Sequence, residues 1–459
     1  PRLPDTRDWV NLRSLGAAGD GETDDTQVIQ QAVRDHQVIY IPTGRYRVSE
    51  TIQLLPNTVL IGMSPITTQL VLADQLDAFA GPGSPGALLQ TAKGGNAVVM
   101  GIGLDTGAFN ERAVAAKWMA GSDSYMNDVR FIGGHGTYNP DGSRVPVYNK
   151  SRTGDPHRYR DWDTQYSSLW ITDGGGGTFK DIWTPNSFAQ AGVYISDTDT
   201  PGRIYAMSIE HHVRNEVMLN NVSNWKLYAM QMEEESAEGP EALPVRIQNC
   251  ENIQFANTYL YRVIRMSDSC PHAILVNHSK DIEFCGLHVY SPTVYSFDNT
   301  LYDQTHDVHV RQREIARLTV SGNPPERKKD NSESAVLHAD AQVEKVIGGF
   351  EFIAGAAADK DGNVFFVDSR LHHIYKWAPE KQNLTLIRNT PFQPLAPGFD
   401  ESGNLLVTTR DGHVVSFHPD SSGEALQVLE PVNPNEHDAD IALMRSEEHT
   451  SELQSLLII

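Results

Sequence analysis

The sequence predicts an all-β protein, built as a solenoid of parallel β coils followed by a short, incomplete β-propeller-like segment. From about residue 50 to residue 320, short β-rich runs are broken by Asn, Gly and Asp. A signature of Asn or Asp followed by an aliphatic or aromatic residue recurs at Asn224, Asn252 and Asp281, and such regular spacing is typical of a solenoid. Further along, the segment beginning at Asp359 aligns with the segment beginning at Asp400, and a period near 40 residues is typical of a propeller blade.

The composition restricts the function. The chain has 459 residues, 39% hydrophobic residues and a formal charge of −22. This charge disfavours nonspecific binding to nucleic acid. No apolar run approaches the ~18 residues of a membrane-spanning helix. We therefore expect no nucleic-acid or membrane partner.

The N-terminal region predicts a helix after a loop rich in Gly and Asp, which extends from Gly16 to Asp25. Asp24 or Asp25 is placed to cap this helix, whose apolar face carries Val28, Ile29, Ala32 and Val33. The loop does not have the spacing of a phosphate-binding motif. Together with the Tyr40-Ile41-Pro42 run and Gly44-Arg45-Tyr46, it resembles the opening of the pectate-lyase-like right-handed β-helix superfamily. That resemblance implies a right-handed β-helix whose open end is capped by this helix.

Two segments stand out as long insertions into the coils, His135 to Gln165 and Gly174 to Asp199. Loops that leave one side of a solenoid commonly build its binding groove, so we expect these segments to contribute to a binding site.

The domain boundaries follow changes in composition. We expect the β-helix over residues 1–320, a linker over 321–335, incomplete propeller blades over 336–440, and a non-native or disordered tail over 441–459. The blades resemble those of gluconolactonase-like or NHL-type propellers, but only about two fit in this length. The tail resembles translated sequencing adapter, which indicates a metagenomic gene; an ordinary polar helical tail is the alternative.

The candidate catalytic residues are Glu210 and Glu233. They are one predicted coil apart, so their carboxyl groups are expected on neighbouring rungs, roughly 5 Å apart in strand spacing. Stacked carboxylates repel, and we expect one of them to keep its proton near neutral pH. Such a pair can supply the general acid of glycoside hydrolysis.

Most of residues 9 to 300 resembles glycoside hydrolase family fifty-five, the β-1,3-glucanases. The most specific parts are Ser208 to His212, Gln231 to Glu233, and the segment from Arg246-Ile247 to Tyr259-Leu260-Tyr261. The resemblance implies inverting hydrolysis, with Glu233 as general acid, Glu210 as a supporting carboxylate and a water held by polar side chains. Ile209, Met232 and the Asn215-Glu216-Val217 segment depart from the family pattern. Members of that family carry two β-helices, and the resemblance covers only the second, so we expect a missing N-terminal β-helix as a partner. We also expect a secreted or periplasmic bacterial location.

The remaining site residues are chosen as sugar contacts, because aromatic faces stack on sugars and polar side chains bond hydroxyl groups. They are His135, Trp162, Asp163, Gln165, Tyr166, Trp170, His211 and Gln231. His211 and His212 are adjacent on a predicted strand and should point to opposite faces. No spacing of zinc-ligand type is present, so we expect no metal and no cofactor.

Three functions follow in order of preference. The first is a glycoside hydrolase acting on a polysaccharide, with a β-1,3-glucan as the expected substrate. The second is a polysaccharide lyase on the same fold, which needs an Arg or Lys base and calcium against a uronate. The third is a noncatalytic carbohydrate-binding fragment of a larger enzyme.

Overall fold

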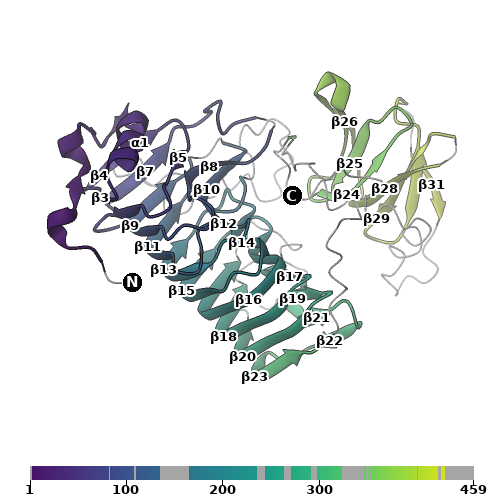
Figure 1. The fold of residues 1–459 in the computed structure, drawn as a ribbon. Coiled ribbons are helices and arrows are strands. Elements are labelled where there is room, and N and C mark those ends of the chain that lie inside the picture. Colours follow the sequence, from purple (N-terminus) through teal and green to yellow (C-terminus); the bar gives the residue numbers. More distant parts are fainter. Residues whose placement is uncertain are drawn as a thin grey trace. The chain divides into compact units, whose positions relative to one another are not determined.

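The computed structural model shows a parallel β-helix, as the sequence predicts, and a separate C-terminal unit of antiparallel strands (Figure 1). The structure describes residues 3–81, 83–107, 110–134, 165–234, 243–262, 270–290, 297–322, 346–347, 350, 353–400, 402–421 and 425–429. Within these residues, no helix is both long and apolar enough to cross a membrane.

Two ladders of parallel strands form the long walls of the solenoid. The first sheet contains β1 (Val10–Asn11), β2 (Asp20–Asp24), β3 (Val38–Tyr40), β4 (Gly44–Val48), β6 (Val59–Ile61), β7 (Thr68–Leu72), β9 (Val98–Asp105), β11 (Tyr125–Ile132), β13 (Gly177–Thr184), β15 (Gly202–Glu210), the second half of β16 (Asn215–Glu234), β18 (Glu251–Arg262) and β20 (Lys280–Tyr290). The second sheet contains β5 (Ile52–Gln53), β8 (Gly86–Gln90), β10 (Ala113–Trp118), β12 (Leu169–Ile171), β14 (Ala191–Thr198), the first half of β16, β17 (Val245–Gln248), β19 (Cys270–Asn277) and β21 (Phe297–Asp303).

Both ends of the ladder are covered. At the N-terminal end, helix α1 (Thr26–Asp35) buries Ile29, Ala32 and Val33 in the core, as the capping prediction requires. Asp25 occupies the N-cap position, but its carboxylate accepts hydrogen bonds from the Ala18 and Gly19 amides of the preceding loop. At the other end, β22 (Val308–Val310) and β23 (Glu314–Val320) pair antiparallel with β21 and β20, which satisfies the last strand edge.

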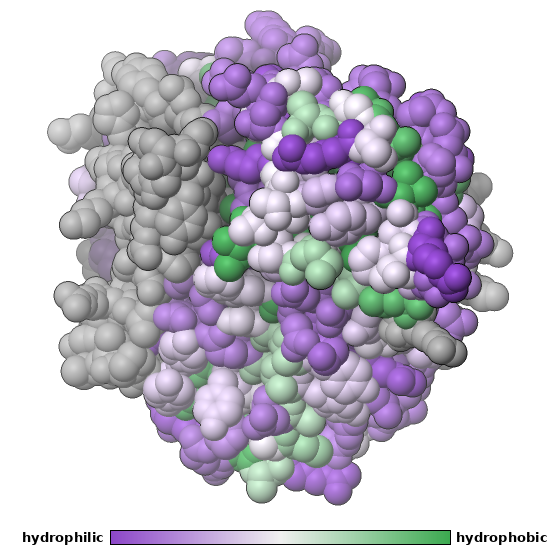
Figure 2. Space-filling view, turned by 90° about the vertical axis from the view of Figure 1, so that its left-hand side faces the viewer, coloured by the Kyte–Doolittle hydropathy of each residue, from purple (hydrophilic) through white to green (hydrophobic). Residues whose placement is uncertain are grey.

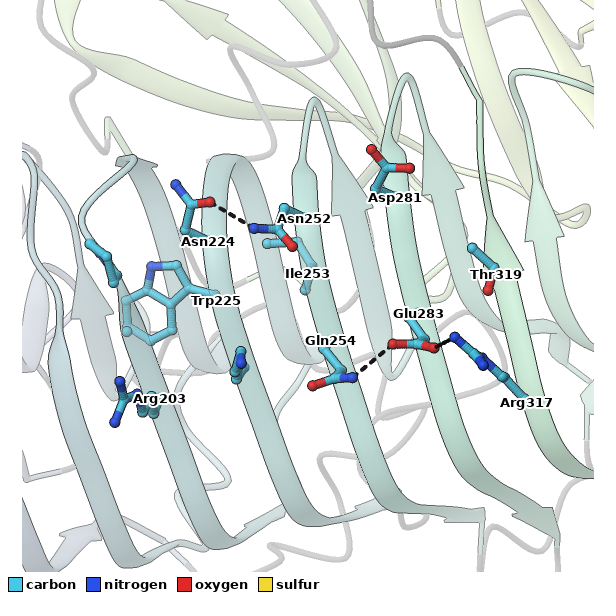
Figure 3. A pocket seen from close by; sticks show the side chains of 13 residues that line it. Arg203, Asn224, Trp225, Asn252, Ile253, Gln254, Asp281, Glu283, Arg317 and Thr319 are labelled. Carbon is cyan, nitrogen blue, oxygen red and sulfur yellow. Dashed lines mark hydrogen bonds and ion pairs between the residues drawn. The ribbon is translucent and has the colours of Figure 1, made fainter.

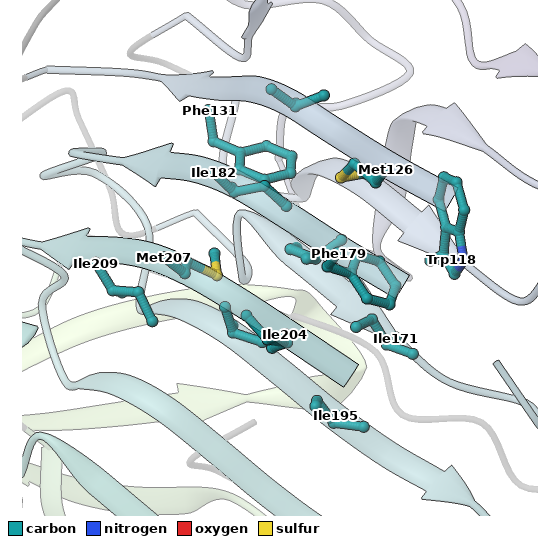
Figure 4. Close-up of a cluster of buried hydrophobic side chains, with 14 of the residues drawn as sticks. Trp118, Met126, Phe131, Ile171, Phe179, Ile182, Ile195, Ile204, Met207 and Ile209 are labelled. Atoms are coloured by element: carbon teal, nitrogen blue, oxygen red, sulfur yellow. The ribbon is translucent and has the colours of Figure 1, made fainter. Parts of the chain in front are cut away.

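The core is built by stacking equivalent side chains of successive coils. One such column contains Met126, Phe179, Ile204, Leu227, Phe255 and Phe284, each in register with the next and all fully buried. Figure 4 shows part of this column beside Met207 and Ile209 of β15. Each such side chain contributes roughly 2 kcal/mol through burial. On the face drawn in Figure 2, hydrophilic side chains predominate and hydrophobic patches are small and separate.

The Asn and Asp signature of the sequence marks a corner of the coil. Asn224, Asn252 and Asp281 occupy equivalent positions on successive rungs, and all three have a left-handed backbone. The Asn252 side-chain amide donates to the Asn224 side-chain oxygen at 2.8 Å. Asn and Asp tolerate this conformation better than other residues with a Cβ, which is why they recur here.

The segment from Gly174 to Asp199, expected as an insertion, is instead regular solenoid, because it contains β13 and β14 in register with their neighbours. Residues 135–164 of the other expected insertion lie outside the described residues.

A second column of left-handed residues, here called the left-handed ladder, crosses the first sheet. Its members are Gly101, Asp128, Asp181, Ala206, Ala229, Asn257 and Gly286. Each adds one residue between inward-facing positions: Ile204 and Met207 of β15 are both buried, with two residues between them instead of one. The ladder therefore shifts the in-out alternation for the rest of each strand.

The C-terminal unit contains two four-stranded antiparallel sheets. They are β24 (Ile353–Ala358), β25 (Val364–Asp368), β26 (His373–Ala378) and β27 (Asn383–Asn389), and β28 (Pro394–Phe399), β29 (Leu405–Thr409), β30 (Val414–Phe417) and β31 (Leu426–Leu429). Asp359 accepts hydrogen bonds from the backbone and side-chain amides of Asn363, and Asp400 does the same with Asn404. The sequence repeat is therefore a structural repeat, while the assignment to a propeller stays a prediction.

The left-handed ladder generates a stability prediction at Ala206 and Ala229, where a side chain with a Cβ occupies a conformation that glycine adopts more easily. We expect Ala206→Gly and Ala229→Gly each to raise the free energy of unfolding by about 0.5–1 kcal/mol. The matched control is Ala256→Gly, one residue before the ladder on β18, which should lower it by about 0.5–1 kcal/mol. Urea unfolding followed by tryptophan fluorescence measures all three, and destabilisation by all three substitutions would contradict the argument.

Candidate active site on the first sheet

Glu210 and Glu233 lie directly opposite each other on paired strands. Glu210 ends β15, and the register pairs it with Glu233 near the end of β16. The residues before them, Ile209 and Met232, are buried in the core, so both glutamates project from the outer face of the sheet. The departures from the family pattern at Ile209 and Met232 therefore concern core packing rather than the outer surface.

A hydrogen-bonded network joins the two carboxylates. The Ser208 hydroxyl lies 2.5 Å from Glu210 Oε1 and also contacts the Gln231 side-chain oxygen. The Gln231 Nε2 group donates to the Tyr261 hydroxyl at 2.7 Å, and that hydroxyl donates to Glu233 Oε2 at 2.5 Å. The network fixes the orientation of both carboxylates before any ligand binds.

Tyr261 is a site residue that the sequence analysis did not select. Burial raises the pKa of Tyr261, and the hydrogen bond to Glu233 and the nearby carboxylates raise it further. Its hydroxyl therefore stays protonated and serves as a donor to Glu233. A signal for it was present in the sequence, because Tyr261 ends the Tyr259 to Tyr261 segment that resembles the β-1,3-glucanase family.

Alternation along a strand predicts that the two histidines after Glu210 point to opposite faces, and this prediction is wrong. Strand β15 ends at Glu210, and His211 adopts a left-handed conformation with φ of 70°, which ends the alternation. Both side chains are consequently buried. The His211 Nε2 atom lies 3.6 Å from Glu210 Oε2, which places this imidazole beside the carboxylate pair.

Behind the carboxylate pair, the buried side chains of His212 and Glu216 contact each other. The His212 Nδ1 atom lies 2.5 Å from Glu216 Oε2, and its Nε2 atom lies 2.9 Å from the Thr184 hydroxyl. Burial raises the pKa of Glu216 well above its usual value and lowers the pKa of His212 to about 3. The pair is consequently held in its neutral form, with one proton shared between carboxyl and imidazole.

Glu234 and Arg262 form a further buried contact in this region. Both side chains are almost completely buried, and Arg262 Nε lies 3.0 Å from Glu234 Oε2. Burial raises the pKa of Glu234 to about 8, although the Arg262 charge opposes that shift. The acidic run at Glu233 and Glu234 is thus split between the outer surface and the interior, because adjacent residues of a strand face opposite ways.

An aromatic surface continues from the carboxylate pair across the next strands. Tyr261 stacks with Tyr290 at a ring-centroid distance of 5.4 Å, and Tyr259 stacks with His288 at 4.4 Å. Tyr259 and Tyr290 are 42% and 45% exposed, so their rings are accessible to a ligand.

The other predicted sugar contacts do not join this surface. Gln165 and Tyr166 are buried, and Gln165 bonds Thr106 and the Gly107 carbonyl. Trp170 lies on the second sheet, where its ring stacks with Tyr194 and its Nε1 donates to Ser196. These three side chains are structural contacts of the solenoid wall.

His135, Trp162 and Asp163 lie outside the described residues. Among the residues that the structure describes, there is no group of three or more His, Cys, Asp or Glu side chains placed to hold a metal ion.

Comparison with known families identifies the N-terminal part of the solenoid. Residues 9–200 match the family model described as Rhamnogalacturonase A/epimerase, pectate lyase-like, so this part is a pectate-lyase-like domain. The carboxylate pair lies beyond the matched residues.

Sequence relatives match over short stretches. A pre-neck appendage protein of Bacillus phage B103 is 40% identical over 53 residues, which cover 12% of this chain and 6% of that protein. A glucan 1,3-beta-glucosidase of Cochliobolus carbonum is 36% identical over 61 residues, covering 12% of this chain and 8% of that protein. The chain thus matches less than a tenth of the length of these relatives.

Solved structures of similar fold include sacteLam55A from Streptomyces sp. SirexAA-E, with 12% identity and a TM-score of 0.44, covering 68% of this chain and 54% of that one. The enzymatically active domain of tailspike protein 2 from bacteriophage CBA120 has 16% identity and a TM-score of 0.38, covering 61% of this chain and 38% of that one.

The buried Glu234 carboxyl generates a pH prediction. Its pKa is raised on folding, so its stabilising contribution is complete below about pH 4.5 and is lost as pH rises through about 8. Relative to Glu234→Gln, the wild-type protein should lose about 2–4 kcal/mol of unfolding free energy across this range. Urea unfolding at several pH values measures the difference. Glu251→Gln, at a partly exposed carboxylate, is the control and should show no such slope; a flat difference for Glu234→Gln would contradict the assignment.

Proposed function

Because residues 9–200 form a pectate-lyase-like domain, we propose that the chain is part of a glycoside hydrolase acting on a polysaccharide, with a β-1,3-glucan as the first candidate substrate. The observation that carries this proposal is the direct register of Glu210 and Glu233 on the outer face of the first sheet. Two carboxyl groups at this spacing repel when both are ionised, and one shared proton relieves the repulsion. A protonated carboxyl beside an ionised one is the requirement for acid-assisted cleavage of a glycosidic bond.

In this proposal Glu233 is the general acid. It protonates the leaving oxygen, while Glu210 stabilises the positive charge that develops on the sugar. Tyr261 and Gln231 hold the Glu233 carboxyl in place, and His211 contacts Glu210. The hydrogen-bond partners of the two carboxyl groups thus differ, which supports different roles for them.

The proposal includes inversion of configuration, which the resemblance to glycoside hydrolase family fifty-five implies. Both carboxyl groups project from neighbouring rungs of one sheet, so they approach a sugar from the same side. For inversion, a water attacks the anomeric carbon from the opposite side of the sugar.

The substrate class rests on two further observations. The exposed rings of Tyr259 and Tyr290 offer stacking surfaces for sugars beside the carboxylate pair. One sequence relative carries the name glucan 1,3-beta-glucosidase, which favours a β-1,3-glucan. A polysaccharide substrate also fits a secreted or periplasmic location.

A polysaccharide lyase is the second candidate, favoured by the words "pectate lyase-like" in the description of the matching family. The two reactions leave different products. Hydrolysis of laminarin releases reducing ends without ultraviolet absorbance, whereas a lyase acting on pectin or alginate produces an absorbing unsaturated uronate. Binding without either product would identify a noncatalytic carbohydrate-binding fragment.

Replacing the proposed acid tests the mechanism. Glu233→Gln keeps the shape of the side chain but removes the transferable proton, so kcat on laminarin should fall by about 10²–10⁴-fold. Laminarin binding, measured by calorimetry, should change little. Glu251→Gln, on a neighbouring strand of the same sheet, is the matched control and should retain activity. An active Glu233→Gln protein would rule out the acid assignment.

Removing the Tyr261 hydroxyl tests the positioning network. Tyr261→Phe leaves the stacked ring in place but removes the donor to Glu233, and we expect kcat to fall about tenfold with KM nearly unchanged. Tyr290→Phe is the control, because Tyr290 stacks on the same ring without bonding the carboxylates. Equal effects of the two substitutions would show that Tyr261 acts only by packing.

A further inference from the structure

A pocket lies on the outer face of the first sheet, away from the carboxylate pair. Its cavity volume is about 480 Å³. Residues on or next to β15, β16, β18, β20 and β23 line it (Figure 3). Arg203 and Lys226 line it. Arg203 lies seven residues before Glu210 on β15, and Lys226 lies seven residues before Glu233 on β16. The pocket and the carboxylate pair therefore occupy the two ends of the same pair of strands.

Two of the three cationic side chains that line this pocket, Arg203 and Lys226, lie next to each other on paired strands. Arg203 and Lys226 are direct register partners, and both are exposed. Among the described residues, neither makes a salt bridge or a side-chain hydrogen bond. Like charges directly opposite each other on paired strands are destabilising, so an anion placed between them would relieve the repulsion.

The acidic side chains of the pocket, Glu283 and Asp281, already have cationic or hydrogen-bonding partners. Glu283 accepts from Gln254 Nε2 at 2.7 Å and pairs with Arg317 at 2.5 Å, contacts that lower the pKa of Glu283 (Figure 3). Asp281 lies 3.6 Å from Lys280. The pocket therefore has uncompensated positive charge at Arg203 and Lys226, and compensated charge at its other end.

We propose that Arg203 and Lys226 form a subsite for an anionic substituent of the glycan, either the carboxylate of a uronic acid or a sulfate ester. This inference rests on the proposed function only in taking the ligand to be a glycan. The guanidinium of Arg203 can bond two oxygens of either anion, and the Lys226 ammonium adds a second charge. Seven strand residues span at most about 23 Å, so a short oligosaccharide lying along the strands reaches from this subsite to the carboxylate pair.

The overall charge of −22 does not exclude such a ligand. Exposed charges are screened beyond about 8–10 Å at physiological salt, so an anion in the pocket responds mainly to the residues that line it. The subsite would let the protein select acidic or sulfated glycans over neutral ones, although its global charge repels polyanions.

The test compares anionic and neutral probes by isothermal titration calorimetry. The probes are an oligogalacturonate, a sulfated carrageenan oligosaccharide and a neutral laminari-oligosaccharide, each titrated into the Glu233→Gln protein so that cleavage does not interfere. Adding Arg203→Gln and Lys226→Gln should weaken binding of at least one anionic probe about tenfold or more and leave the neutral probe unaffected. The anionic probe that responds identifies carboxylate or sulfate as the preferred group.

Two control variants keep the outcome interpretable. The charge-preserving exchange Arg203→Lys with Lys226→Arg should retain most of the binding. Arg34→Gln with Lys93→Gln makes the same change in net charge on exposed residues outside the pocket and should bind as the parent does. Unchanged binding of both anionic probes after loss of Arg203 and Lys226, or an equal loss for the neutral probe, would overturn the proposal.

Failure of this inference is distinguishable from failure of the proposed function. Anion binding that depends on Arg203 and Lys226, together with an active Glu233→Gln enzyme, would keep the subsite and remove the acid assignment. Loss of hydrolysis in Glu233→Gln without any effect of the two cations on binding would do the reverse.

Discussion

The register between successive coils is the constraint on which the rest of this structure depends. Parallel hydrogen bonding places each residue against its equivalent one coil later, so one inward-facing position becomes a continuous column of core side chains. The left-handed ladder adds one residue, at the same height, to each of the strands of the first sheet from β9 to β20. Without that extra residue, alternation from Ile204 would turn Ser208 and Glu210 into the core; with it, Met207 and Ile209 face inward and the carboxylate faces outward.

The solenoid was predictable because its signals are local and repeated. The Asn and Asp residues at 224, 252 and 281 mark a left-handed corner that few other residue types tolerate, and the spacing of Glu210 and Glu233 equals one coil. The misassigned residues lack such a signal. Gln165 and Tyr166 have the composition of a sugar-binding surface, but their burial depends on Thr106 and other residues distant in the sequence. The segment from Gly174 to Asp199 was misread because its glycine-rich start resembles a loop, although it leads directly into two regular strands.

The buried acids were equally hidden from the sequence. A run such as Glu233 and Glu234 is ordinarily solvated, and only the pairing of β16 with β18 shows that Glu234 faces Arg262 in the interior. Glu216 is held beside His212, and the charges of Glu210 and Glu233 add to the effect of burial on its pKa. A neutral Glu216 limits the negative charge gathered behind the carboxylate pair. An additional buried negative charge there would disfavour ionisation of the nearby carboxyl groups, because like charges repel.

The two ends of the outer face of β15 and β16 carry opposite charges. Cations occupy one end of the two strands, at Arg203 and Lys226. Two tyrosines whose rings contact each other, Tyr205 and Tyr228, lie next along the strands, and carboxylates occupy the other end. A polysaccharide chain is also directional, because its two ends differ. An anionic unit held at the cationic end would fix both the position and the direction of the chain, and would leave a defined glycosidic bond at Glu233. Because the coils set all of these side chains on paired strands, the same register that builds the core also sets the distance between the two cations and the carboxylate pair.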